Sequence, residues 1–210
     1  MPTFPVDLLT YLGGCARIDQ QTFTLGEGLL MQPRTAGGEV IRAGGAARLW
    51  RGAVQLHALR YGDARAVHAK LHVLAGPGAS FWVSDYRHKA PTIAGAILNF
   101  NATTRDIVTL KGLPAGHVIN PWDYIAFDYF GRRAFHQVLS RVVATSTGTT
   151  GNIDIVPPFR TGMAVNIPVQ VGSPALRAVM VPGTLKVGTS GMVATSGASF
   201  EWTQTLRENP

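Results

Sequence analysis

Two histidines have the clearest metal-like spacing in the chain. His68 and His72 stand four residues apart on a segment that predicts a helix, so both fall on one helix face. Zinc sites use this spacing, but Ala69-Lys70-Leu71 separates the pair where a metalloprotease needs a glutamate, and Lys70 adds a cation. We expect a solvated helix face or a subunit interface and no metal site. The other histidines stand alone and predict structural or exposed positions. They are His57, His88, His117 and His136.

Carboxylates are scarce, with twelve Asp and Glu in total. Asp123 and Asp128 are five apart on one predicted strand, so they point to opposite faces and do not form a local glycosidase pair. Pairing in space with Asp85, Asp106 or Asp154 stays open.

Motifs for nucleophilic catalysis or nucleotide binding are absent from the sequence. No serine centres a G-x-S-x-G elbow, no phosphate-binding P-loop pattern occurs, and Cys15 follows Gly13-Gly14 with no adjacent histidine. Gly26 and Gly28 do not extend to a dinucleotide fingerprint. We therefore predict that the protein is not an enzyme, with no catalytic, cofactor-binding or metal-binding residues and no cofactor.

Aromatic residues suggest packing first and binding second. The four tryptophans lie in or beside predicted strands, where we expect core anchors, with stacking on bases or sugars as the alternative. They are Trp50, Trp82, Trp122 and Trp202. A barrel that exposes Tyr124, Phe127 and Tyr129 beside Arg132-Arg133 would suit oligonucleotide binding. Phe127 and Tyr129 share a strand face, however, and that face is as easily the inside.

Composition sets the class of protein. The chain has 210 residues, of which 46% are apolar and 15% charged, and this is enough material for a packed core. The single cysteine excludes an intrachain disulfide and suits a reducing compartment or a protein that is indifferent to redox state. The net charge of +7 raises nucleic acid as a partner, but Arg132-Arg133 is the only adjacent basic pair. No apolar run approaches the roughly 20 residues of a membrane span, and residues 1–7 lack a secretory pattern.

Short apolar or alternating stretches broken by Gly, Pro, Ser, Thr and Asn predict antiparallel sheet. Residues 47–60 alternate most clearly, with Trp50, Val54, Leu56 and Ala58 on one face. Further strands are expected at the following ranges: 81–86, 107–110, 122–129, 134–138, 142–144, 153–156, 165–171, 178–181, 185–187 and 199–204. We expect 122–129 and 134–138 to form one hairpin, and 142–144 and 153–156 another.

One helix interrupts the strands, at about residues 63–75. Asp63 is placed to cap it, the stripe Val67, Leu71 and Leu74 is placed to pack on a sheet, and Gly76-Pro77 ends it. The fold class is therefore mainly β. We expect a β-sandwich domain carrying this helix, formed by 1–92 and 175–210, and a smaller inserted β-barrel-like domain, 93–174.

Several runs resemble the distal tail proteins at the tail tip of long-tailed phages and prophages, over roughly residues 45–202. The runs are Arg48-Leu49-Trp50-Arg51-Gly52, 65–71, Ser80-Phe81-Trp82-Val83, 112–119, 121–125, 133–138 and Pro157-Pro158-Phe159-Arg160. Residues 1–44 have no match in this resemblance.

The resemblance implies a tail-tube-like β-sandwich that assembles as a ring, expected to be hexameric, between the tail tube protein and the tip hub protein. DNA would pass through the ring as cargo. The protein would be a structural virion component of the tail tip or baseplate, assembled in the host cytoplasm, without membrane insertion. We expect the segment 35–46 to reach a neighbouring subunit as a hairpin arm. Alternatives are a carbohydrate- or nucleic-acid-binding β module, a cell-wall hydrolase, or another tail subunit of the tube or hub.

Overall fold

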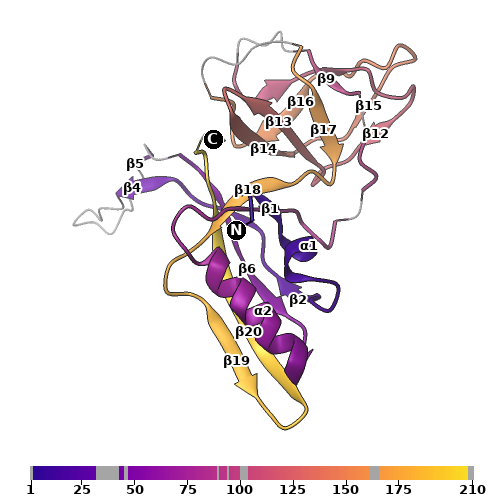
Figure 1. Ribbon diagram of the computed structural model, residues 1–210. Helices are drawn as coiled ribbons and strands as arrows, with labels where there is room; N and C mark the ends of the chain where they lie inside the picture. Colours follow the sequence, from indigo (N-terminus) through magenta and orange to yellow (C-terminus); the bar gives the residue numbers. More distant parts are fainter. Residues whose placement is uncertain are drawn as a thin grey trace, which may run out of the picture. The chain divides into compact units, whose positions relative to one another are not determined.

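The computed structural model describes residues 2–31, 43–44, 47–88, 90–93, 95–99, 104–160 and 166–207 (Figure 1). Strands account for 42% and helices for 11%, in curled sheets and half-barrels, which confirms the predicted mainly-β class. Within the described ranges there are two helices, where the sequence predicted one.

The chain divides into two compact units. The first comprises residues 1–8, 81–177 and 206–210, and the second comprises 9–80 and 178–205. The sequence-based domains, 1–92 with 175–210 and 93–174, remain a prediction, and in the structure residues 81–92 belong to the same compact unit as 93–174. Two hydrogen bonds explain this grouping: the Ala90 amide donates to Ser173 Oγ, and Ser173 Oγ donates to the His88 carbonyl.

The first unit is built on a curled five-stranded sheet in the order β10-β16-β14-β13-β17. Three further strand pairs accompany it: β1 parallel to β8, and β9–β11 and β12–β15 antiparallel. The strands are β1 (Val6–Asp7), β8 (Phe81–Val83), β9 (Ile97–Leu98), β10 (Ile107–Val108), β11 (Leu110–Lys111), β12 (Val118–Ile119), β13 (Tyr124–Tyr129), β14 (Arg132–Val138), β15 (Val142–Val143), β16 (Ile153–Val156) and β17 (Val169–Gly172).

The hairpin predicted from 122 to 138 is confirmed. Strands β13 and β14 pair from Tyr124 opposite Gln137 to Tyr129 opposite Arg132, and Phe130-Gly131 makes the turn. The second predicted hairpin is wrong, because β15 pairs with β12, whereas β16 pairs with β14 and β10. Alternation in the sequence identifies a strand but does not name its partner.

The aromatic residues of β13 point inward. Phe127 is 0% exposed, and Tyr124 and Tyr129 are also buried. Phe127 and Tyr129 belong to a continuous apolar core that includes Ile125, Val138 and Val171. The hypothesis that Tyr124, Phe127 and Tyr129 form an exposed base-stacking surface is therefore wrong.

The second unit is a long antiparallel sheet with a helix. Residues Ala178–Met180 of β18 pair with β20, β20 pairs with β6, and β6 pairs with β2 and β3. Strand β19 extends along the first half of β20 as a long hairpin (Figure 1). The strands are β2 (Ile18–Gln21), β3 (Thr24–Leu25), β4 (Leu29–Met31), β5 (Ala43–Gly44), β6 (Trp50–Leu56), β7 (Leu59–Arg60), β18 (Leu176–Met180), β19 (Lys186–Ser190) and β20 (Ala194–Gln204).

The alternation predicted for 47–60 holds along β6, where Trp50, Val54 and Leu56 are buried. The expectation for Ala58 is wrong, because this residue is exposed. The strand stops after Leu56 and resumes as β7, so Leu59 takes the buried place.

Helix α2 (Tyr61–Leu74) confirms the predicted helix and its buried stripe of Val67, Leu71 and Leu74. It packs against β20 and β7. The predicted cap is wrong: Arg60 occupies the capping position without a side-chain bond, and Asp63 lies in the first turn. A carboxylate there still interacts favourably with the helix dipole. The helix missed from the sequence is the single turn α1 (Leu8–Leu12).

Trp50 and Trp202 anchor the core of the second unit, as predicted for these two tryptophans. Both are buried, and the Phe23 ring lies 5.4 Å and 5.0 Å from them. Gly52 permits this packing, because a Cβ atom there would lie 1.9 Å from the Thr22 carbonyl oxygen and 2.8 Å from Trp202 Cζ2. The predicted arm at 35–46 lies outside the described residues except for β5, which pairs with β4.

Candidate functional site

The predicted histidine pair lies on α2, but the two side chains differ in environment. His68 is half-buried, with its Nε2 atom enclosed, and His72 is exposed. Among the described residues, no group of three or more His, Cys, Asp or Glu is placed to hold a metal ion. Cys15 is exposed and carries a free thiol.

The other two tryptophans that were predicted to be core anchors, Trp82 and Trp122, are not fully buried. Trp82 is half-buried beneath the Arg133 guanidinium, whose central carbon lies 5.6 Å from the ring centroid. Trp122 is 70% exposed, so the core prediction is wrong for this residue. It occupies a turn with a φ of 78°, and its amide donates to the Val138 carbonyl at 3.0 Å.

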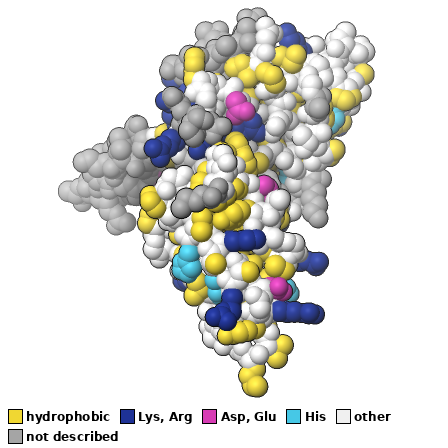
Figure 2. All heavy atoms as spheres, in the orientation of Figure 1, with side chains coloured by type: hydrophobic (Ala, Val, Ile, Leu, Met, Phe, Trp, Pro, Cys, Tyr) yellow, Lys and Arg dark blue, Asp and Glu magenta, His cyan; other side chains and the backbone are white. Residues whose placement is uncertain are grey.

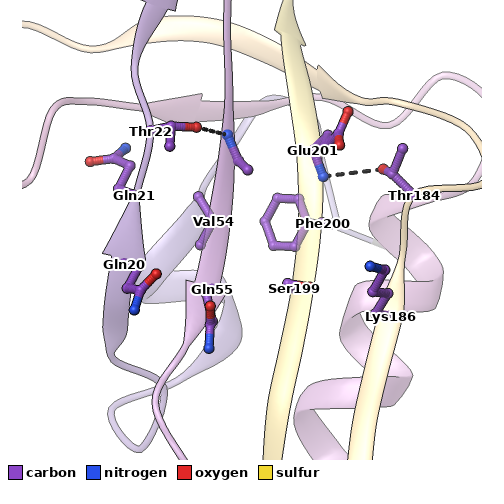
Figure 3. A pocket seen from close by; sticks show the side chains of 11 residues that line it. Gln20, Gln21, Thr22, Val54, Gln55, Thr184, Lys186, Ser199, Phe200 and Glu201 are labelled. Carbon is purple, nitrogen blue, oxygen red and sulfur yellow. Dashed lines mark hydrogen bonds between the residues drawn. The ribbon is translucent and has the colours of Figure 1, made fainter.

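The exposed face of the long sheet carries the first hollow, of about 250 Å³ (Figure 3). Strands β2, β6, β20 and β19 bring its polar side chains together. The lining residues are Gln20, Gln21, Thr22, Ala53, Val54, Gln55, Thr184, Lys186, Ser199, Phe200 and Glu201. An adjoining hollow shares Thr22, Ala53 and Glu201 and adds Thr24, Arg51 and Thr203.

Hydroxyl groups at this hollow hold the backbone in place. Thr22 Oγ1 accepts from the Ala53 amide at 2.8 Å, and Thr184 Oγ1 accepts from the Glu201 amide at 3.1 Å (Figure 3). The exposed Gln20 amide of this face suits polar contacts with a neighbouring molecule. Alternation along β6 and β20 produces the face, since the opposite side chains form the apolar core.

The first unit has a hollow of its own, of about 450 Å³, where a titratable cluster lies. Its lining includes Asp85, Tyr86, His88 and Ser173. Asp85 accepts hydrogen bonds from the Arg87 amide at 3.1 Å and from the Tyr124 hydroxyl at 3.4 Å. The cluster therefore ties the segment 84–88 to strand β13.

His88 gives this segment a second attachment. Its Nε2 lies 2.9 Å from Asp123 Oδ1, although the two groups are not aligned as a straight hydrogen bond. The His88 ring meets the Tyr124 ring edge-on, with 5.7 Å between centroids. Ser173 Oγ is engaged as both donor and acceptor, with the His88 carbonyl at 2.5 Å and the Ala90 amide at 3.0 Å.

Two phenols are held in the protonated form: Tyr86, which lines this hollow, and Tyr124, which binds Asp85. Burial, and then the negative charge of Asp7, raises the pKa of Tyr86 to about 12. Burial, and then the charge and hydrogen bond of Asp85, raises the pKa of Tyr124. At neutral pH both phenols keep their protons, and the Tyr124 hydroxyl donates to Asp85.

Sequence reasoning missed this cluster because its members lie far apart in the chain. His88 was expected to stand alone, yet it lies beside Asp123. Gly172 is the one local signal: its φ is 106°, and a Cβ atom there would lie 2.4 Å from the Pro91 carbonyl oxygen. This close approach accompanies the contacts of Ser173 with the backbone of His88 and Ala90.

A buried histidine lies in the core of the same unit. His136 Nδ1 donates to the Pro157 carbonyl at 2.6 Å, and its ring stacks on Phe127 and meets Phe159 edge-on. Burial lowers the pKa of His136 to about 4, which leaves the imidazole neutral at physiological pH. It fits the structural position expected for a lone histidine.

No helix in the described part of the chain is both long and apolar enough to cross a membrane. No protein-family model matches this chain, and no curated protein matches it either.

Proposed function

We propose that the protein is a ring-forming structural component of a phage tail tip, of the distal tail type, joining the tail tube to the tip hub. The resemblance over residues 45–202 suggests this role, and the mainly-β fold is compatible with it. The ring is hexameric in this proposal, admits DNA as cargo, and assembles in the host cytoplasm before it becomes part of the virion.

The observation that carries the proposal is the state of the sheet edges in the second unit. Within the described ranges, β2 pairs with β6 alone and β19 pairs with β20 alone. Each edge thus presents backbone donors and acceptors to a neighbour, and head-to-tail contacts between two such edges close into a ring when the rotation between neighbouring subunits allows it. On the β2 edge, an exposed Asp19 and a shift in register limit how far another strand can pair with it. On the β19 edge, an exposed Lys186 and the φ of 80° at Gly188 have the same effect. Such features favour a defined partner over open-ended aggregation.

The exposed polar face of the long sheet, which carries the two adjoining hollows, is assigned to the wall of the DNA channel in this proposal. Its lining is dominated by hydroxyl and amide side chains, with Arg51, Lys186 and Glu201 as the charged members. A channel wall of mixed, low charge would let DNA pass without holding it, because phosphate attraction grows with each unneutralised Lys or Arg.

Mass measurement in solution, followed by negative-stain imaging, tests the ring. We expect particles of several protomers with a central opening at micromolar concentration. Because charged contact surfaces are screened by ions, rising salt should change the assembled fraction. A chain that stays monomeric at all concentrations and salt levels, alone and with its tube and hub neighbours, would contradict the proposal.

Exposed Trp122 favours one second candidate, a binding module. A rigid aromatic ring that is open to solvent can stack on a sugar or a base. Titration of the monomer with chitohexaose and with a thymidine 20-mer, followed by tryptophan fluorescence, tests this. Saturable quenching that is lost in Trp122→Ala supports the module, and no response to either probe counts against it.

A further inference from the structure

An exposed apolar patch lies at the end of the β19–β20 hairpin in the second unit. Met192 is fully exposed, and Val193 and Tyr61 are 79% and 51% exposed. The Tyr61 amide donates to the Val193 carbonyl at 3.3 Å, so the first residue of α2 and the hairpin turn lie side by side. We call Tyr61, Met192 and Val193 the tip patch. Hydrophobic side chains gather at the foot of Figure 2, where Figure 1 shows the hairpin turn.

The turn that carries the tip patch is firmly held. The Gly191 amide donates to the Ala194 carbonyl at 2.8 Å, and the Ser190 and Thr195 hydroxyls lie 3.0 Å apart. Next to the turn, Ala194 and Thr195 pair with β7, and Thr195 is buried. The framework therefore fixes two aliphatic side chains in solvent where a folded monomer gains nothing from them.

Arginines flank the patch. The Arg65 guanidinium carbon lies 5.9 Å from the centroid of the Tyr61 ring, and exposed Arg60 pairs with Ala194. Tyr, Met and Arg are enriched in the cores of protein interfaces. The composition is thus that of a protein contact.

The small size of the tip patch, and its position next to the open edge of β19, indicate which surface it belongs to. A stable protein interface buries about 800 Å² on each partner, more than three side chains supply, so the patch belongs to a larger contact surface. The turn directly follows β19, the open edge, whose Val187 is also exposed. We infer that the tip patch and the β19 edge form one continuous interface with a second copy of this chain. This inference rests on the proposed ring and names the side chains that stabilise each joint.

The double variant Met192→Asp with Val193→Asp tests the inference. Because both side chains are exposed, we expect its melting temperature to stay within about 2 °C of the wild type. We expect the dissociation constant between protomers, measured by mass photometry over a dilution series, to rise about 100-fold or more. Leu139→Asp is the matched control, since Leu139 is a 55% exposed aliphatic residue of the first unit, and it should leave that constant unchanged.

A photo-crosslinker at position 192 gives an independent readout in an otherwise unchanged chain. We expect a product of twice the protomer mass, with crosslinked peptides from two copies. Rings that persist in the double variant without a crosslink between chains would overturn the inference and leave the ring proposal standing. Equal loss of assembly in Leu139→Asp would also overturn it. A wild type that never assembles would overturn both.

Discussion

The two units differ in the kind of polar side chain that they bury. In the described part of the first unit the buried set includes ionisable groups: Asp123, Arg133, His136 and Arg177. Among the described residues of the second unit, the buried polar ones are neutral: Gln21, Ser80, Thr195 and Gln204. The described part of the first unit therefore buries charged side chains within its own fold, whereas that of the second depends on apolar packing and buries none of its charged side chains fully. Stability of the first unit should respond to pH and to charge deletion, and stability of the second to cavities.

The largest effect is expected in the second unit, from Trp202→Ala. The side chain is fully buried, and its ring contacts Phe23 and reaches the Gly52 backbone position. Losing this volume should cost about 3–5 kcal/mol of unfolding free energy, because the surrounding sheet closes the cavity only partly. Denaturant titration measures the loss of unfolding free energy, and hydrogen exchange of strand amides shows in which unit the loss occurs. Protection should fall in β6 and β20 and persist in β13 and β14. Val73→Ala, at an exposed site on α2 that is 44% exposed, is the control and should change stability by less than about 1 kcal/mol.

Acid should destabilise the first unit through His136. Its pKa is about 4 in the folded chain and near 6.5 in the unfolded chain, so the unfolded state binds more protons between these two values. Stability from this group is therefore fully present above pH 6.5, falls as pH decreases towards 4, and levels off below 4. The total change is about 3 kcal/mol. Measuring the unfolding free energy of the wild type and of His136→Gln between these two pH values isolates the contribution of His136, because the other titrating groups are common to both proteins. Parallel stability curves for the two proteins would refute the assignment.

The third-largest loss of unfolding free energy is expected for Arg133→Ala. The Arg133 guanidinium donates to Asp128 at 3.0 Å, to Gln170 at 2.5 Å and to the Ala175 carbonyl at 3.1 Å, and it covers Trp82. Arg133→Ala leaves Gln170 and the Ala175 carbonyl without this donor, for an expected loss of about 2 kcal/mol.

Asp128→Asn separates the charge from the hydrogen bonds of Arg133. The Asp128 side chain is 66% exposed, so its ion pair is screened by water. We expect a loss below about 1 kcal/mol in this variant. Chemical denaturation at neutral pH compares the two, and an equal loss in both would mean that the ion pair, and not the neutral partners, is the main contribution.

Local patterns predicted the fold where one face of an element is buried. The stripe Val67, Leu71 and Leu74 and the alternation of Trp50, Val54 and Leu56 report burial directly, and both are confirmed. Pairing between distant strands leaves no such trace. Nothing around 142–144 indicates that β15 pairs with β12 and not with β16, since the choice depends on the whole sheet.

The candidate sites were harder to predict because their members come from separate segments. His88 and Asp123 are 35 positions apart, and each is unremarkable in its own segment. The polar face of the second unit was in principle visible as the exposed half of the β6 alternation, in Arg51 and Gln55. Its hollow depends on Thr22 and Thr184, which lie outside β6 and β20 and have no sequence signal.

The smallest effect, and the one of opposite sign, is expected at Trp122. This residue has a φ of 78° between Pro121 and Asp123, a backbone conformation that favours glycine. The Asp123 amide donates to the Asn120 carbonyl at 3.1 Å, and Asp123 Oδ2 accepts from the Asn120 amide at 2.7 Å, so the turn holds its shape. Because the ring is mostly in solvent, its removal costs little packing, and relief of strain should dominate. We therefore expect Trp122→Gly to raise the unfolding free energy by about 0.5–1 kcal/mol, whereas Trp122→Ala, which keeps a Cβ atom, should not. A loss of more than about 1 kcal/mol in Trp122→Gly would mean that the ring packs within the first unit. The comparison of the two units would then have to count Trp122 among the core residues of the first unit, beside its buried charged groups.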